Sequence, residues 1–163
     1  MGSSNYETGA GMYTDLTPHV GSAVITQTDA VPASDGASTG ATVVLMYCAF
    51  KAGTNGSYVY KIRFMPQGTT AALASTATTL RVFLSTVATV EGAAAGATTI
   101  ANTHLLAEVA TPAVTTAATT AAVTPFEVPL NISIPTGMHI LVCQHVAQAN
   151  AVTWCATVFG GDR

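Results

Sequence analysis

The stretch Phe126–Ile134, which reads FEVPLNISI, alternates strictly between apolar residues and residues that are polar or proline. Successive side chains of a β-strand point to opposite faces, so this two-residue period predicts one strand with one buried face. Pro129 falls on the outward-facing side and has no N–H to donate, which favours an edge strand or a bulge. The stretch therefore predicts a half-buried strand of an antiparallel sheet.

Seven further segments predict strands. Tyr58–Phe64 (YVYKIRF) also alternates, which predicts that both of its tyrosines lie on the apolar face and both of its basic residues on the other. The continuous apolar run Thr42–Phe50 (TVVLMYCAF) predicts a strand that is covered on both faces and lies centrally in its sheet. The other five segments are Val20–Thr26, Thr79–Ser85, His104–Val109, Met138–Val146 and Val152–Phe159.

These strands predict one all-β domain over residues 18–163. A chain of 163 residues fits a single domain. Ala and Thr make up about a third of it, which leaves few of the Glu, Lys and Arg residues that cover long helices. Pro135-Thr136-Gly137 suits a tight link between strands, because proline presets φ and glycine accepts positive φ. We therefore expect an antiparallel two-sheet β-sandwich, jelly-roll-like, with about eight strands.

Two kinds of segment fall outside the strand pattern. Residues 1–17 are rich in Gly, Ser and Thr and have no apolar period, which predicts an extended N-terminal arm. Thr86–Thr103 and Thr111–Thr124 consist mostly of Ala, Thr and Val, and we interpret both as long loops between strands. Their near-absence of charge suggests contact with neighbouring molecules; exposed loops of small residues are the alternative.

The charge content excludes some partners. Only 8% of the residues are charged, against about 25% in an average soluble domain, and the net charge is −3. Five basic residues cannot neutralise a row of phosphates, so we expect no nucleic-acid binding. No apolar run approaches the length of a membrane span and the first residues do not resemble a secretion signal, so we expect no membrane partner and synthesis in the cytoplasm.

The sequence contains none of the common catalytic motifs, such as G-x-S-x-G, a P-loop or H-E-x-x-H, and no pair of carboxylates stands out. His139, Cys143 and His145 share one face of a predicted strand. The two histidines would lie about 20 Å apart on an extended chain, too far to bind one ion. We therefore expect no enzyme, no cofactor and no metal, with packing or surface roles for these side chains.

The aromatic side chains could lie either in the core or in a binding site, and the cysteines could be either buried thiols or disulfide partners. Trp154 could stack on a sugar, but its apolar strand favours a place in the core. The same weighing places Tyr58 and Tyr60 at an edge of the core. Three cysteines, at positions 48, 143 and 155, form an odd set without C-x-x-C spacing, which predicts buried thiols and no disulfide framework.

Several segments resemble small virion proteins of tailed bacteriophages, above all capsid decoration, or cement, proteins. The resemblance covers roughly residues 58–163. It is carried by IRFMPQGTTAA (62–72), LRVFLST (80–86), LLAEVATPA (105–113), VPLNISIPTGMHILV (128–142) and the final FGGDR.

This resemblance implies a structural protein on the exterior of the capsid, made in the host cytoplasm, which stabilises the shell by bridging subunits of the major capsid protein. It also implies self-association, as a homotrimer or alternatively a dimer. A tail, fibre or receptor-binding module is the second hypothesis, and a hydrolase or metalloenzyme is the third. Apolar residues on the arm and the two loops are the expected partner-binding positions: Tyr6, Met12, Tyr13, Leu16, Val90, Ile100 and Val114.

Overall fold

The computed structural model describes residues 16–26, 28–30, 46–68, 73–116, 124–148 and 152–163. These residues contain ten β-strands and no helix. The strands are β1 (Thr17–Ile25), β2 (Tyr47–Lys51), β3 (Ser57–Gly68), β4 (Leu73–Ser75), β5 (Thr78–Ser85), β6 (Thr103–Thr111), β7 (Val114–Thr116), β8 (Phe126–Ile134), β9 (His139–Gln144) and β10 (Val152–Asp162).

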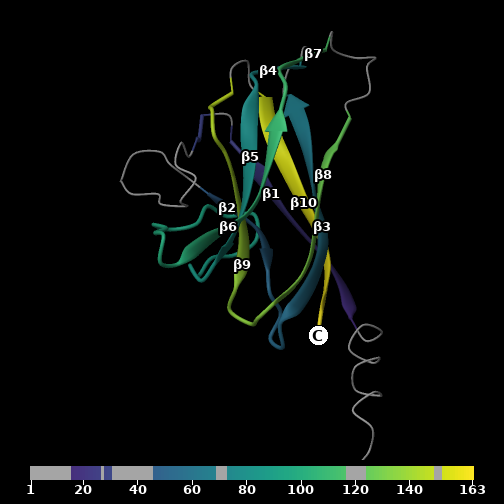
Figure 1. Cartoon of the computed structure of the whole chain (residues 1–163), viewed down its shortest axis with the longest axis vertical. Coiled ribbons are helices and arrows are strands. Elements are labelled where there is room, and N and C mark those ends of the chain that lie inside the picture. Colours follow the sequence, from purple (N-terminus) through teal and green to yellow (C-terminus); the bar gives the residue numbers. More distant parts are fainter. Residues whose placement is uncertain (1–15, 27, 31–45, 69–72, 117–123, 149–151) are drawn as a thin grey trace, which may run out of the picture.

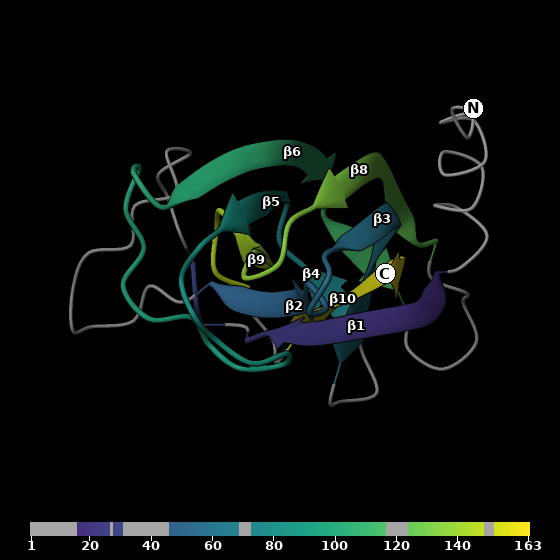
Figure 2. The same ribbon diagram turned by 90° about the horizontal axis from the view of Figure 1, so that it is seen from below.

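The eight longer strands form two antiparallel sheets of four, in the orders β1-β10-β3-β8 and β2-β9-β5-β6. The short strands β4 and β7 form a separate ribbon at one end of the molecule (Figure 1). Figure 2 shows the two sheets packed face to face, with β1 beside β2 on one side and β6 beside β8 on the other. The predicted all-β, two-sheet antiparallel sandwich is therefore confirmed.

The main core fills the space between the sheets. Its largest members, among them Phe50, Phe64 and Trp154, are fully buried. The ring of Trp154 meets Phe126 edge-on with centroids 5.8 Å apart, a favoured aromatic arrangement. The prediction that Trp154 belongs to the core is confirmed.

A second, smaller core lies on the other face of the β2-β9-β5-β6 sheet. Phe83, Leu141 and the thiols of Cys48 and Cys143 are buried there, packed against Ala95 from the segment between β5 and β6. We call this segment, residues 86–102, the cover segment. It is a loop, as predicted, but part of it packs on the β2-β9-β5-β6 sheet of the same chain rather than facing outward only.

The position of β2 corrects one prediction. The apolar run that ends at Phe50 was expected in the centre of a sheet, but β2 is an edge strand. The cover segment bonds to this edge, because Cys48 N donates to Ala93 O (2.9 Å) and Ala95 N donates to Met46 O (2.7 Å). A continuous apolar run predicts that both faces of a strand are covered. A loop such as the cover segment can cover one of these faces, so the run does not show that the strand is central in its sheet. The rest of the predicted strand, residues 42–45, lies outside the described residues.

The tyrosines of β3 correct a second prediction. Val59 is fully buried, whereas Tyr60 is 44% exposed and Tyr58 is half-buried. The pairing of β3 with both of its neighbours shifts between Val59 and Lys61, so the inward and outward positions change places there. Alternation read from the sequence cannot detect such a bulge, and it put both tyrosines on the wrong face.

Strand β8 lies where Pro129 predicted, at the edge of its sheet. Opposite the irregularity in β3, Asn131 has φ of +50°, a conformation that asparagine tolerates better than most residues. Several strand boundaries differ from expectation: β3 continues to Gly68 and β10 to Asp162, whereas β9 ends at Gln144 rather than Val146. The short strand β7 also interrupts the predicted loop Thr111–Thr124 and pairs with β4.

Candidate functional site

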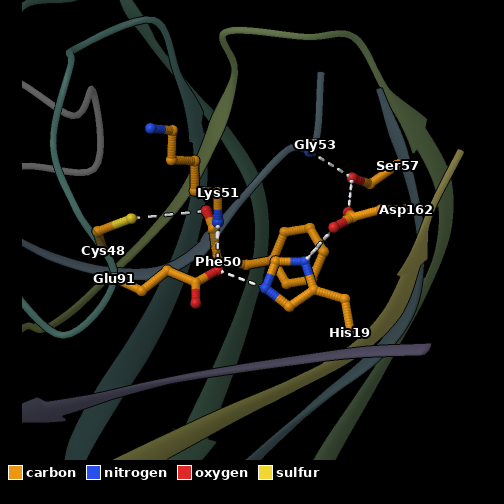
Figure 3. Close-up of polar contacts among 8 residues, drawn as sticks. All are labelled: His19, Cys48, Phe50, Lys51, Gly53, Ser57, Glu91 and Asp162. Atoms are coloured by element: carbon orange, nitrogen blue, oxygen red, sulfur yellow. Dashed lines mark hydrogen bonds and ion pairs between the residues drawn. The ribbon is translucent and has the colours of Figure 1, made fainter. Parts of the chain in front are cut away.

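A chain of polar contacts joins β1, β10 and the cover segment (Figure 3). His19 on β1 lies between two carboxylates. Its Nδ1 is 3.0 Å from Asp162 on β10, and its Nε2 is 2.9 Å from Oε1 of Glu91 on the cover segment. The imidazole ring packs against Phe50 of β2 with centroids 4.2 Å apart. We call His19, Glu91 and Asp162 the histidine bridge.

Backbone and hydroxyl groups extend the histidine bridge at both ends. Ser57 Oγ donates to Asp162 and accepts from Gly53 N at 2.9 Å. Oε1 of Glu91 also accepts from Lys51 N at 2.8 Å, which fixes the cover segment to β2. The bridge therefore ties both sheets and the cover segment together.

Gly21 allows β1 to approach β2 closely enough for these contacts. A Cβ atom at this position would lie 2.2 Å from the carbonyl oxygen of Ala49 and 3.0 Å from Oε1 of Glu91. Any other residue would push the two backbones apart. The glycine is required by the space between strands, since its φ is not in the left-handed region.

The two carboxylates set the protonation state of the imidazole. Burial alone would lower the pKa of His19, but the hydrogen bonds and charges of Asp162 and Glu91 outweigh it and raise the pKa above 6.5. Only the imidazolium form donates from both nitrogens, which is why the carboxylates favour it. For Asp162, burial acts to raise the pKa, but hydrogen bonds from Ser57 and His19 lower it on balance.

The order of the contacts determines what the histidine bridge can do chemically. In a nucleophilic triad the imidazole accepts the proton of the hydroxyl, whereas here Ser57 donates to the carboxylate and both imidazole nitrogens face carboxylates. Beside the bridge lies an open depression of about 400 Å³, lined by Lys51, Thr54 and Val90 among others. The arrangement suits an ionic contact that holds strands together and not the activation of a nucleophile.

Sequence reasoning missed the histidine bridge. His19 and Asp162 are separated by 143 positions, and Glu91 lies in a segment that has no periodic pattern. Only the pairing of β1 with β10, which aligns His19 with Gly160 two residues from Asp162, brings the first two together. No local signal identifies that pairing.

The expected partner-binding residues do not gather at one place. Val90 and Ile100 lie on the cover segment and are each 64% exposed. Leu16 is half-buried beside Gly161, close to the end of the sandwich opposite β7, which contains Val114 (Figure 1). Tyr6, Met12 and Tyr13, with the rest of residues 1–15, lie outside the described residues.

Large exposed apolar side chains fall on two parts of the chain instead. The sheet group lies on β1 and β3 of the β1-β10-β3-β8 sheet, and the loop group lies on the cover segment and the start of β6. Val146 is the one further exposed large apolar residue in the described part of the chain. The sheet group is Val20, Val24, Tyr60 and Met65, and the loop group is Val90, Ile100, Leu105 and Leu106.

The histidine and cysteine positions singled out in the sequence also have definite places. His139 is buried at the start of β9, where burial and the nearby charge of Lys51 lower its pKa, and His145 lies just beyond the end of this strand. In the described residues, no group of three His, Cys, Asp or Glu side chains could hold a metal ion. The same residues contain no helix long and apolar enough to cross a membrane.

No protein-family model and no curated protein matches this sequence.

Proposed function

We propose that this protein is a structural component of a phage virion, which decorates the outer surface of the capsid and bridges subunits of the major capsid protein. The observation that carries the proposal is the division of the exposed large apolar side chains into the sheet group and the loop group. A protein that bridges subunits as an oligomer needs one surface for the shell and one for its own copies, and the loop group and the sheet group are our candidates for these two surfaces.

The energetics of attachment follow from this division. A contact through a few apolar side chains is weak by itself, but a second contact on the same rigid body forms at a high effective concentration. An oligomer of rigid sandwiches, each held by two cores and by the histidine bridge, keeps its loop groups at a fixed separation. The proposed protein therefore gains affinity from multivalency rather than from one strong site.

The strand order supports a jelly-roll-like connectivity. Successive long strands alternate between the sheets, except for the neighbours β5 and β6, and the first and last strands pair. Sandwiches of eight strands with jelly-roll connectivity form viral capsid domains and lectins. Because a fold hosts many functions, the surface groups and not the topology carry the proposal.

A sedimentation experiment tests it. The purified protein is mixed with expanded, DNA-free heads of the phage that encodes it, prepared without this protein, and the heads are pelleted through sucrose. We expect saturable co-sedimentation and heads that resist heating better than undecorated ones. Heads that pellet without the protein at every concentration would contradict the proposal.

Paired variants locate the contact. Val90→Asp combined with Ile100→Asp places charge in the loop group and should weaken head binding about tenfold or more. Val146→Asp is the matched control, because Val146 is also exposed but belongs to neither group. Equal binding by both variants would remove the loop group from the proposed interface.

One observation favours the second candidate, a receptor- or glycan-binding module. Tyr58 and Tyr60 form an edge-to-face pair with centroids 5.1 Å apart, and Tyr60 is open to solvent. Exposed tyrosine rings can stack on sugar faces. Screening the protein against immobilised glycans, with Tyr60→Ala as the comparison, separates the two candidates: glycan binding lost in this variant would favour the module.

A further inference from the structure

The outer face of the β1-β10-β3-β8 sheet has three rows of side chains across its middle, set by the strand register, and further rows beyond them, such as Thr153 beside Gln67. We call it the sheet face. One row runs from Val20 through Phe159 and Lys61 to Pro129. The next row contains Ser22, Thr157, Arg63 and Glu127. The third contains Val24, Cys155 and Met65. Two rows rich in apolar side chains thus flank one polar row.

The charges on the sheet face are mutually paired. Glu127 lies 2.9 Å from Lys61 Nζ and 2.7 Å from an Arg63 amino nitrogen. Both cations also lie over the ring of Phe159, at 5.5 and 5.4 Å from its centroid. The two bases lower the pKa of Glu127, so the carboxylate stays ionised. The face therefore presents both signs of charge beside exposed apolar side chains, of which Val20 is 59% exposed.

We propose that two copies of this chain pair through their sheet faces, about a two-fold axis that runs parallel to the strands between β10 and β3. The pairing supplies the self-association expected of the proposed function, and it commits to a dimer rather than a trimer, since a surface that meets itself generates two-fold symmetry.

The register makes the sheet face complementary to itself under this axis. Each row then lies opposite the same row of the second copy, with β1 over β8 and β10 over β3. Val20 faces Pro129 of the second copy, and Cys155 faces its Met65. Lys61 faces the second copy's Phe159, a favourable contact for a cation.

The same axis places no charged side chain directly opposite another charged side chain. Arg63 faces Thr157 of the second copy and Glu127 faces its Ser22, so no cation lies directly over a cation. A partner of one charge sign would instead oppose either the two bases or the carboxylate. This is the charge pattern that favours a second copy over an acidic or a basic partner.

The size of the sheet face is sufficient for a specific dimer. Four strands spaced about 4.8 Å apart, over about nine residues at about 3.3 Å each, cover about 600 Å² per copy. Pairing would bury about 1,200 Å² in total, above the roughly 1,000 Å² that a specific interface needs.

Measuring the mass of the purified protein in solution tests the proposal without any capsid. At about 100 µM, sedimentation equilibrium should give twice the monomer mass of 16.5 kDa. Val24→Lys combined with Met65→Lys adds positive charge beside Arg63 and Lys61 and should raise the dimer dissociation constant at least about tenfold. Val90→Lys combined with Ile100→Lys is the control and should leave the mass unchanged. Circular dichroism confirms that each variant is folded.

A monomeric or trimeric mass for the unchanged protein overturns the pairing, as does a dimer that both double variants retain. A dimer that fails to bind heads would leave the pairing intact and contradict only the proposed function. The two failures are therefore distinguishable.

Cross-linking provides a second readout. Cys155 is half-buried on the sheet face, whereas Cys48 and Cys143 are buried. The proposed axis places the Cα atoms of the two Cys155 residues about 11 Å apart, from sheet and strand spacings. Bismaleimidoethane should therefore give a covalent dimer that Cys155→Ser abolishes. A dimeric protein that yields no cross-linked product would contradict this axis.

Discussion

His19 on β1 and Asp162 on β10 are joined by a hydrogen bond of 3.0 Å, although 143 positions separate them in the chain. The bond closes the first strand onto the last, and Glu91 holds the other side of the same imidazole. Burial opposes the charge on this ring, but the two carboxylates outweigh it. The folded protein therefore holds a proton more firmly than the unfolded chain does.

Stability should depend on pH through this residue. The pKa of His19 is raised in the folded state, so its contribution is complete below the unfolded value of 6.5 and is lost as pH rises through the folded pKa. The pKa of Asp162 is lowered, so its contribution is present above 3.8 and is lost as pH falls through the folded pKa. The histidine bridge should stabilise the fold most between these limits.

His19→Gln tests this dependence. It should cost about 1–2 kcal/mol at pH 6 and less at pH 9. Differential scanning calorimetry of both proteins from about pH 5 to about pH 9 measures the difference, and subtraction cancels the titration of the other histidines. A difference in melting temperature that does not change with pH would mean that folding leaves the pKa of His19 unchanged, and a difference that grows as pH rises would mean that folding lowers it.

Glu91→Gln should loosen the cover segment. The substitution removes the charge that pairs with His19 while keeping the size of the side chain. Amides that bond the segment to β2, such as those of Cys48 and Ala95, should exchange with deuterium faster. Mass spectrometry of peptides from residues 46–51 and 86–102 measures the rates.

The matched control is Glu127→Gln, which removes an exposed, paired carboxylate on the sheet face. It should leave exchange in the cover segment unchanged. If both variants exchange alike in this region, Glu91 does not hold the segment in place.

Gly21→Ala should destabilise the fold by about 2 kcal/mol or more, because the added Cβ would meet the carbonyl of Ala49 at 2.2 Å. Gly96→Ala is the control, since its Cβ would lie 4.0 Å from the nearest neighbour, a side-chain carbon of Val87. This second change should stay within about 0.5 kcal/mol. Urea unfolding at a fixed pH gives both values, and equal losses would refute the close approach of β1 to β2.

The three thiols should differ in reactivity. Burial raises the pKa of Cys48 to about 11 and that of Cys143 to about 12, so neither forms a thiolate at neutral pH. Cys155 is partly exposed in a single copy and should react alone with Ellman's reagent when the folded protein is dilute enough for the proposed dimer to dissociate. All three should react in guanidinium chloride. Release of two or more equivalents from the folded protein would show that the second core opens readily.

Local patterns in the sequence predicted most of the strands. The alternation in Phe126–Ile134 and the apolar side of Val152–Phe159 follow directly from the pleat of a strand, and both match the structure. Alternation failed at Tyr58 and Tyr60 because a bulge depends on the strands that lie on either side, which the segment itself does not encode.

Local patterns were enough to predict a charge-poor antiparallel sandwich with Trp154 in its core, because burial of alternate side chains is a local property of each strand. Which strands are neighbours, by contrast, depends on the complete fold. That choice brought His19 to Asp162 and Glu91, made β2 an edge covered by a loop, and aligned three rows of side chains across the sheet face. Such contacts join residues far apart in the chain, and they depend on how all the strands pack at once.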